Sequence, residues 1–297
     1  MSDKVRNYFL LFTISLIWGS QFALNQTLLE VLPSIWIAIL RIFLGMTTIS
    51  FLLFLGKKEK ITYQTKDYLL FILIGFLESA LPLNLMLWGQ EKITGGTAGI
   101  LISTVPIWVV LLSSIYQRKI IWLDICTVIL GFAGVFILLK DQMQTGFELV
   151  RALALLLAAC SFATAILCID HTLSRFPPLT ATRNILIGAF ITLIIFLPFS
   201  NNFSEILNIT WSVKIVSVLL TVGIVCTGLV WLAYTQLIQR AGASFTSMAN
   251  YLMPAIGVLW GFLFFSEVIS VSKIFALLMI VFALFLKPLF QKYFSRV

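Results

Sequence analysis

Glu78 is the only carboxylate that lies well inside a long apolar stretch of this sequence. Burial in an apolar medium favours the neutral form of a lone carboxyl group, so such a residue can bind and release a proton. The alternative is a structural role, in which Glu78 is hydrogen-bonded to a neighbouring helix or paired with a basic group such as Arg41. Glu78 is therefore a candidate site for proton coupling.

Two arginines, Arg41 and Arg183, also lie within apolar stretches. A guanidinium can hold a carboxylate or a phosphate through two parallel hydrogen bonds, which makes both residues candidate anion anchors. Because both are near the ends of their stretches, snorkelling to lipid headgroups or a structural ion pair is the competing interpretation.

Amides and aromatic rings form stripes on one face of several apolar stretches. At about 100° per residue, Trp18, Gln21 and Asn25 share one helix face. Polar groups in an apolar stretch tend to face a wet cavity or the interior of a helix bundle. The stripes predict a cavity for a small organic molecule, and the alternative is hydrogen bonding between helices. The candidate substrate-binding residues are Trp18, Gln21, Asn25, Asn84, Trp88, Trp231, Tyr234 and Asn250.

Prolines occur at related places in two of these stretches. Pro106 and Pro254 each follow a run of small residues, and they are 148 positions apart (254 − 106). Proline removes one helical hydrogen bond and can kink a helix. Both residues are candidate hinges.

The composition of the chain indicates which class of protein these residues belong to. The chain has 297 residues, of which 60% are hydrophobic and only 11% charged, with a mean hydropathy of +1.05. Soluble domains carry about 25% charged residues, so the numbers exclude a soluble globular protein and a disordered chain. The net charge of +8 would suggest a nucleic-acid partner in a soluble protein. Here it indicates basic loops beside a lipid bilayer, and no nucleic acid is expected.

Apolar runs long enough to cross a bilayer as helices follow one another along the whole chain. Short polar breaks separate them, so no room is left for a sizeable soluble catalytic domain. The expected spans are 8–27, 34–55, 69–89, 96–116, 121–139, 150–169, 179–199, 212–236, 243–265 and 271–290.

Lysine and arginine are distributed unevenly between alternate loops. With the N-terminus inside, 13 basic residues fall on the inner side: Lys4, Arg6, Lys57, Lys58, Lys60, Lys66, Arg118, Lys119, Arg175, Arg240, Lys287, Lys292 and Arg296. Five fall outside: Lys92, Lys140, Arg151, Lys214 and Lys273. Because positive charge marks cytoplasmic loops, both termini are expected inside.

The two halves of the chain are similar. Arg41 and Arg183 are 142 positions apart (183 − 41), close to the spacing of the two prolines. Five spans per half is an odd number, so the second half must enter the membrane from the opposite side. The fold class expected is an all-α membrane protein of ten transmembrane helices, built as two inverted five-helix repeats at 1–140 and 141–297.

Several short motifs, in this order and spacing, resemble the EamA type of the drug/metabolite transporter superfamily. They are Ile17-Trp18-Gly19-Ser20-Gln21-Phe22, Pro33 with Arg41, Gly95-Gly96-Thr97-Ala98 with Pro106, Ala243-Ser244 with Asn250-Tyr251-Leu252-Met253-Pro254, and Ser266-Glu267. The resemblance covers essentially the whole chain. It departs at Cys160-Ser161, where the second half does not repeat Trp18-Gly19, and at Lys119, where the first half does not repeat Glu267. The resemblance implies alternating-access transport of small metabolites, commonly export of amino acids or related compounds.

Other classes of function lack their motifs. No Walker sequence, G-x-G-x-x-G or H-E-x-x-H occurs, so neither an enzyme, a metal site nor a cofactor is expected. We expect a secondary transporter of the bacterial inner membrane whose partners are a small-molecule substrate and the lipid bilayer, with its oligomeric state open. The alternatives are a translocase for lipid-linked intermediates, which would have a groove open to lipid, and a non-transporting membrane scaffold, which would lack a polar central cavity.

Overall fold

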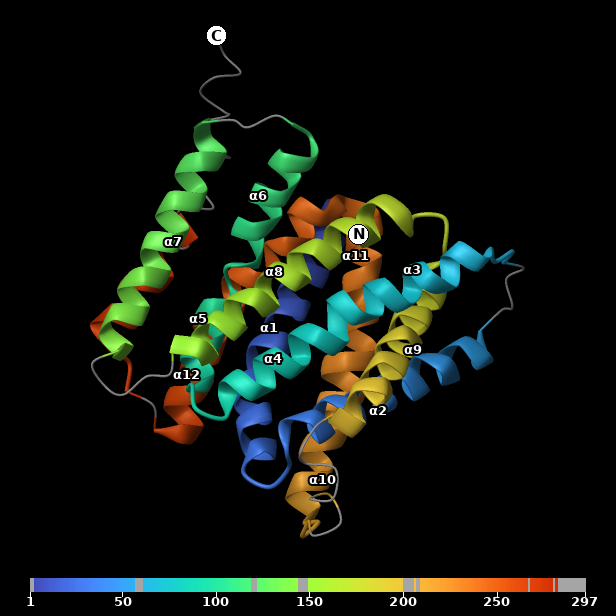
Figure 1. Cartoon of the computed structure of the whole chain (residues 1–297), viewed down its shortest axis with the longest axis horizontal. Coiled ribbons are helices and arrows are strands. Elements are labelled where there is room, and N and C mark those ends of the chain that lie inside the picture. The colour runs from blue at the N-terminus through green and yellow to red at the C-terminus, as the bar shows by residue number, and fades with distance from the viewer. Residues whose placement is uncertain are drawn as a thin grey trace.

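The computed structural model describes residues 3–56, 61–118, 122–143, 149–199, 206, 209–266, 268–279 and 281–282. All regular elements in these ranges are helices (Figure 1). They are α1 Asp3–Leu29, α2 Ser34–Leu55, α3 Thr65–Gly75, η1 Phe76–Ala80, α4 Leu81–Gln90, α5 Gly95–Ile102, α6 Val105–Tyr116, α7 Trp122–Met143, α8 Leu149–Thr172, α9 Pro178–Phe196, η2 Leu197–Phe199, α10 Val213–Leu220, η4 Thr221–Leu229, α11 Val230–Ser247 and α12 Ala249–Phe265.

Seven helices in the described part of the chain are long and apolar enough to cross a membrane. They are Asp3–Leu29, Ser34–Leu55, Thr65–Gln90, Gly95–Tyr116, Leu149–Thr172, Pro178–Phe196 and Val213–Ser247. Shorter apolar helical runs follow at Val128–Ile137 and Leu252–Phe264. The prediction of a helical membrane protein is confirmed. The expected span 271–290 is helical at 271–279 and 281–282, and its remainder lies outside the described residues.

Large hydrophobic side chains cover the outside of the bundle. Phe43, Phe54, Phe136 and Phe196 are exposed, although residues of this type are usually buried in a soluble protein. Buried polar residues are gathered in the interior instead, among them Gln21, Asn25, Arg41 and Asn250. This inside-out distribution is the arrangement expected of a protein whose surroundings are lipid.

Two of the long helices contain a π-helical stretch, which periodicity did not reveal. Residues 76–80 form η1 between α3 and α4, and residues 221–229 form η4 between α10 and α11. In a π-helix the hydrogen bond joins residues five apart, so side chains after it leave the face expected from 100° per residue. Face assignments that cross these stretches are therefore unreliable.

Glycines allow two pairs of helices to approach closely. A Cβ placed on Gly75 of α3 would lie 2.4 Å from both the amide nitrogen of Ala189 and the carbonyl oxygen of Ile185 in α9. A Cβ on Gly45 of α2 would lie 2.8 Å from Cγ2 of Thr227 and 3.2 Å from the amide nitrogen of Gly228 in η4. At both places the backbones themselves are in contact, as small residues permit between membrane helices.

Helix α8 and the helix Thr65–Gln90 are tied together at both ends. Arg175, just beyond α8, forms an ion pair with the buried carboxylate of Asp67. At the other end Arg151 pairs with Glu91 at 2.7 Å. The two helices therefore run antiparallel along their whole lengths, and they cross the middle of the molecule in Figure 1.

Candidate functional site

An interior cavity lies where α1, α4, α5, α6, α8, α11 and α12 meet. Its walls are Trp18, Gln21, Leu83, Met86, Ile102, Val105, Phe162, Trp231, Tyr234, Asn250 and Met253. The volume of about 20 Å³ is enough for one or two water molecules. In this conformation the cavity is contracted around its aromatic walls, and an organic molecule requires the surrounding helices to separate.

Trp18 and Tyr234 form the aromatic corner of this cavity. Their ring centroids are 4.7 Å apart at an interplanar angle of 64°, an edge-to-face contact. The indole nitrogen of Trp18 donates to the carbonyl oxygen of Cys226 at 2.9 Å. Because this carbonyl belongs to the π-helical stretch η4, the irregular backbone there supplies an acceptor that fixes the indole ring.

Arg41 is completely buried behind the wall that Gln21 forms. Its guanidinium donates to Oε1 of Gln21 at 3.0 Å, to Oγ1 of Thr227 at 3.0 Å and to Oδ1 of Asn25 at 3.4 Å. All three acceptors are neutral, and no carboxylate pairs with Arg41 among the described residues. Snorkelling to the membrane surface is excluded by the burial of this side chain. Arg41 instead places an uncompensated positive charge directly behind the cavity wall.

Asn25 extends this network away from the cavity. Its side-chain nitrogen donates to Oε1 of Gln90 at 3.1 Å, and Gln90 in turn donates to the carbonyl oxygen of Phe22 at 3.0 Å. The network therefore joins α1, α2, α4 and η4 through buried amides. Asn25 serves Arg41 and Gln90, and it does not line the cavity.

Glu78 lies in η1 and is buried with only 3% of its surface exposed. Neither carboxylate oxygen has a hydrogen-bond partner in the described part of the chain. Glu78 lines a small void together with Trp231, Tyr234 and Thr235, and the first two of these residues also line the central cavity. An ion pair between Glu78 and Arg41, one of the structural alternatives, is not found. The carboxyl group is instead separated from the cavity by a single layer of aromatic side chains.

Arg183 differs from Arg41 in its surroundings. It is half-buried in α9 and donates to Oδ1 of the adjacent Asn184 from Nε at 3.1 Å and from Nη2 at 2.9 Å. Asn184 also donates to the hydroxyl of Tyr63 at 3.2 Å. Arg183 is not among the residues that line the cavity, so similar positions in the two halves have different environments.

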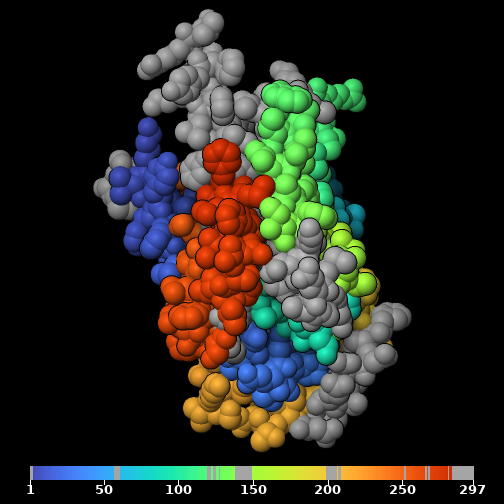
Figure 2. Space-filling view, turned by 90° about the vertical axis from the view of Figure 1, so that its left-hand side faces the viewer, coloured from blue at the N-terminus to red at the C-terminus, as the bar shows by residue number. Residues whose placement is uncertain are grey.

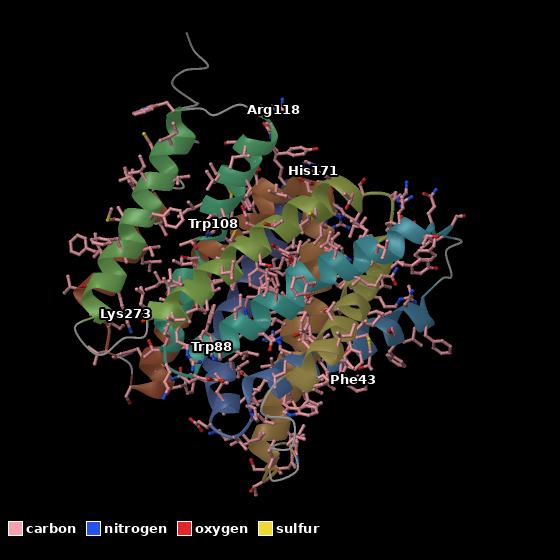
Figure 3. The ribbon with its side chains drawn as sticks, in the orientation of Figure 1. Phe43, Trp88, Trp108, Arg118, His171 and Lys273 are labelled. Atoms are coloured by element: carbon pink, nitrogen blue, oxygen red, sulfur yellow. The ribbon has the colours of Figure 1, made fainter. Side chains whose placement is uncertain are left out.

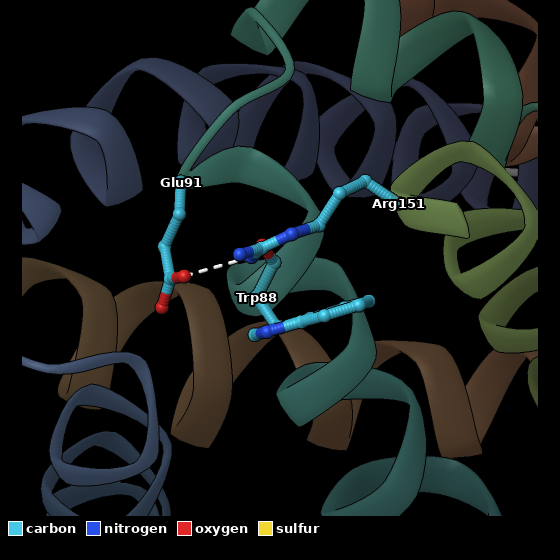
Figure 4. Close-up of polar contacts among 3 residues, drawn as sticks. All are labelled: Trp88, Glu91 and Arg151. Carbon is cyan, nitrogen blue, oxygen red and sulfur yellow. Dashed lines mark hydrogen bonds and ion pairs between the residues drawn. The ribbon is translucent and has the colours of Figure 1, made fainter. Parts of the chain in front are cut away.

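Asn84 and Trp88 also lie outside the cavity walls, because α4 presents Leu83 and Met86 there. The side chain of Asn84 donates to the carbonyl oxygen of Ala80 within its own helix. Trp88 lies under the guanidinium of Arg151, with 3.8 Å between Cζ and the ring centroid (Figure 4). Arg151 also donates to the carbonyl oxygen of Trp88. Trp88, Glu91 and Arg151 together hold one end of α4 against α8, and we call this group of three residues the clamp.

A larger recess opens at the opposite end of the bundle, near His171. His171 is in the last turn of α8, whereas Trp88 lies beside Arg151 in the first turn of that helix (Figure 3). The recess has a volume of about 390 Å³ and is lined by Leu112, Ser113, Tyr116, Gln117, Thr164, Leu167, Cys168, Asp170, His171, Thr172, Ala243 and Ser244. The rings of His171 and Tyr116 are stacked there at 5.2 Å. Polar side chains such as Asp170, His171 and Ser244 line it beside apolar ones such as Leu112 and Leu167.

Both predicted hinge prolines follow an interruption of their span. Residues Ser103 and Thr104 form a turn between α5 and α6, and Pro106 stands in the first turn of α6. Met248 interrupts the helix between α11 and α12, and Pro254 lies inside α12. A further break occurs at Gly242, whose φ is 82°. The amide nitrogen of Ala243 there donates to Oδ2 of Asp170 at 3.2 Å.

Sequence reasoning missed the apolar part of the cavity wall. Leu83, Met86, Phe162 and Met253 look like any other membrane-helix residues, since only polar and aromatic residues stand out in an apolar run. No group of three potential metal ligands is present among the described residues. Glu267, which belongs to one of the family motifs, lies outside the described residues.

Comparison with known proteins identifies the family. The sequence model of the EamA-like transporter family matches twice, at residues 5–140 and 150–287. An uncharacterized transporter of Archaeoglobus fulgidus is 25% identical over 258 residues, which are 86% of this chain and 89% of that protein. The uncharacterized transporter YoaV of Bacillus subtilis is 23% identical over 278 residues, which are 92% of this chain and 94% of that protein.

The fold is similar to one that has been solved experimentally. A crystal structure superposes with a TM-score of 0.70 over 98% of this chain and 99% of the other, at 14% sequence identity. At that identity the likeness concerns the fold alone. The family model covers nearly the whole sequence, and seven helices in the part of the chain that the structure describes are long and apolar enough to cross a membrane. The chain therefore belongs to the EamA-like transporter family and is a multi-pass membrane protein.

Proposed function

We propose that this protein is a secondary transporter that moves a small organic metabolite through the central cavity by alternating access. One observation carries the proposal: both matched halves supply walls of the same cavity. Trp18, Gln21, Leu83, Met86, Ile102 and Val105 come from the first half, and Phe162, Trp231, Tyr234, Asn250 and Met253 come from the second. A binding site at the junction of two repeats is the usual arrangement in transporters of this kind.

The two halves are proposed to be inverted five-helix repeats, 1–140 and 141–297, with ten spans and both termini inside. The double family match and the basic-residue bias support this. Similar glycine contacts also support it, since Gly75 meets α9 and Gly45 meets η4. Rocking of one half against the other would open the contracted cavity to each side in turn, with Pro106 and Pro254 as the hinges.

The cargo is proposed to be an amino acid or a derivative of one, moved outward across the bacterial inner membrane. The cavity suits a molecule with an apolar body and polar ends, because Leu83, Met86 and Phe162 stand beside the amides of Gln21 and Asn250. Arg41 would favour a carboxylate group of the cargo through Gln21. A non-transporting scaffold, the competing class, would have no reason to retain a buried cavity with amide groups in its wall.

Glu78 is proposed to couple transport to a proton gradient. Its two unpartnered oxygens can accept a proton without breaking an existing hydrogen bond.

Flux in proteoliposomes tests these proposals. A panel of amino acids and related metabolites is first screened for thermal stabilisation of the purified protein, and each binder is then assayed for flux. We expect Trp231→Leu and Asn250→Ala to reduce flux by about tenfold or more, equivalent to about 1.4 kcal/mol. Trp211→Leu is the matched control, because Trp211 is exposed and lies outside the cavity.

The coupling proposal needs its own variant and readout. Glu78→Gln should retain exchange of cargo between the two sides while losing the acceleration that a pH gradient produces. An unchanged pH dependence in that variant would remove Glu78 from the mechanism. Absence of flux for every bound compound, under both pH and concentration gradients, would contradict the transporter proposal itself.

A further inference from the structure

A second large recess lies on the side of α1 that faces away from the central cavity. Its volume is about 450 Å³, and its lining residues come from α1 and the turn after it, from α12 and from the first turn of α10. They are Ser20, Ala23, Leu24, Thr27, Glu30, Lys214, Trp260 and Phe264. The α1–α2 turn, the end of α12 and α10 lie at the same end of the molecule in Figures 1 and 2.

The recess faces the bilayer. At about 100° per residue, Ser20, Leu24 and Thr27 lie on the face of α1 opposite to Trp18. On α12 the recess is bordered by Phe264, which is 67% exposed, and by Trp260, whose ring lies 5.0 Å from that of Phe264. An apolar, open wall on the outside of a membrane protein is in contact with lipid.

A tight contact between α1 and α12 separates the recess from the central cavity. A Cβ on Gly19 would lie 2.6 Å from Cβ of Ile256 and 3.1 Å from the carbonyl oxygen of Met253. Trp18 and Met253 line the central cavity, whereas Ser20 lines the recess. The two spaces are therefore on opposite sides of a closed helix contact, and a molecule in the recess is not on the proposed transport path.

Charges of opposite sign stand at one end of the recess. Glu30 follows the last turn of α1, and Lys214 is in the first turn of α10; both side chains are exposed. Neither forms an ion pair with another described residue. From Glu30 the apolar wall extends to Ser20, a distance of about 15 Å at 1.5 Å per residue. The recess is therefore charged at the ends of the helices and apolar along the rest of its length.

A charged end beside an apolar wall matches the chemical structure of one class of lipid, in which a charged headgroup is joined to apolar acyl chains. We propose that the recess binds a phospholipid whose headgroup carries both a phosphate and a primary ammonium group. Lys214 binds the phosphate, Glu30 accepts hydrogen bonds from the ammonium group, and one acyl chain packs along Leu24, Trp260 and Phe264. An anionic headgroup would meet repulsion from Glu30, and a trimethylated ammonium group has no N–H to donate to a carboxylate.

Native mass spectrometry of the delipidated protein tests this site. The probes are dioleoyl-phosphatidylethanolamine, dioleoyl-phosphatidylcholine and dioleoyl-phosphatidylglycerol, each titrated in the same detergent. The ethanolamine lipid is expected to bind about fivefold more tightly than either of the others, the ratio that one surface charge contact supplies. Lys214→Ala and Glu30→Gln should each remove that preference. Lys92→Ala, at an exposed lysine outside the recess, is the control and should keep it.

Two further variants make the outcome decisive. Phe264→Ala should weaken the binding of all three lipids equally, because it removes acyl-chain contact and leaves the charges in place. The double variant Glu30→Lys with Lys214→Glu should restore the ethanolamine preference that each single variant loses, even if one single variant folds poorly. Equal binding of the three lipids by the natural protein, or a preference untouched by all charge variants, would overturn the proposal. The readout is lipid retention, so it is independent of whether any cargo is transported.

Discussion

The guanidinium of Arg41 donates to Oε1 of Gln21 at 3.0 Å, and Gln21 is itself part of the cavity wall. A buried charge that neutral groups alone hold in place is costly unless each hydrogen bond is made. Arg41 meets this condition through acceptors on α1 and η4, two segments separated by about 200 positions in the sequence (227 − 25 = 202). The cation therefore fixes the position of α1 relative to η4 and gives the cavity its electrostatic character.

Replacing Arg41 with lysine tests this role. The ammonium group of lysine cannot contact Gln21, Asn25 and Thr227 together, because those acceptors surround a planar guanidinium. We expect a loss of about 2–4 kcal/mol in the free energy of unfolding, measured in detergent by thermal or denaturant unfolding. Arg183→Lys is the matched control and should lose less than half as much, since Arg183 bonds only to its neighbour Asn184 in the described structure. Similar losses in both variants would contradict the network.

A substitution at Gly75, where α3 is in contact with α9, is expected to act through steric overlap alone. An alanine Cβ at this position would lie 2.4 Å from backbone atoms of α9, which cannot move aside as a flexible side chain can. Gly75→Ala is expected to force α3 and α9 apart and to cost about 2–3 kcal/mol or more, seen as a reduced yield of monodisperse protein. At Gly56 the nearest atom to a new Cβ would be 3.4 Å away, so Gly56→Ala should purify normally. Normal behaviour of both variants would show that the two backbones are farther apart.

Asp170 links α8 to the helix that begins after Gly242. Its carboxylate accepts from the amide nitrogen of Ala243 at 3.2 Å, where the chain has just left the left-handed backbone conformation of Gly242. Asp170→Ala should cost about 1 kcal/mol in stability, as loss of a helix cap does. Asp170→Asn retains an oxygen acceptor and should recover most of that loss. A stability of Asp170→Asn no better than that of Asp170→Ala would show that the charge, and not the hydrogen bond, is what matters.

In the contact shown in Figure 4, Arg151 makes two different interactions, an ion pair with Glu91 and a stacking contact with the ring of Trp88. Arg151 pairs with Glu91 at 2.7 Å while its guanidinium lies on the ring of Trp88. Because Glu91 is partly exposed, Glu91→Gln should cost under about 1 kcal/mol, and less at high salt. Trp88→Leu should cost more and show little salt dependence, since it removes stacking and packing. A double-mutant cycle between Arg151→Met and each of these variants measures both couplings, and an equal salt dependence of the two would contradict the assignment.

The sequence by itself determined that this is a helical membrane protein of the EamA-like family. Hydrophobic runs of about 20 residues can satisfy their backbone in lipid only as helices, so composition and length were sufficient. The order of short motifs then identified the family. Trp18, Gln21, Trp231, Tyr234 and Asn250 were selected because polar or aromatic groups in such runs are conspicuous, and all five line one cavity.

Only the tertiary structure decided which of the other residues border that cavity. A helical wheel assumes 100° per residue, and the π-helical stretches at 76–80 and 221–229 break that assumption. The structure places Glu78 beside Trp231 and Tyr234, and it places Trp88 in a clamp against α8. Whether Arg41 faced lipid or the interior depended on partners from η4, far away in the sequence. Partners of that kind are set by how helices pack, and a hydrophobic pattern carries no information about which helix will be the neighbour.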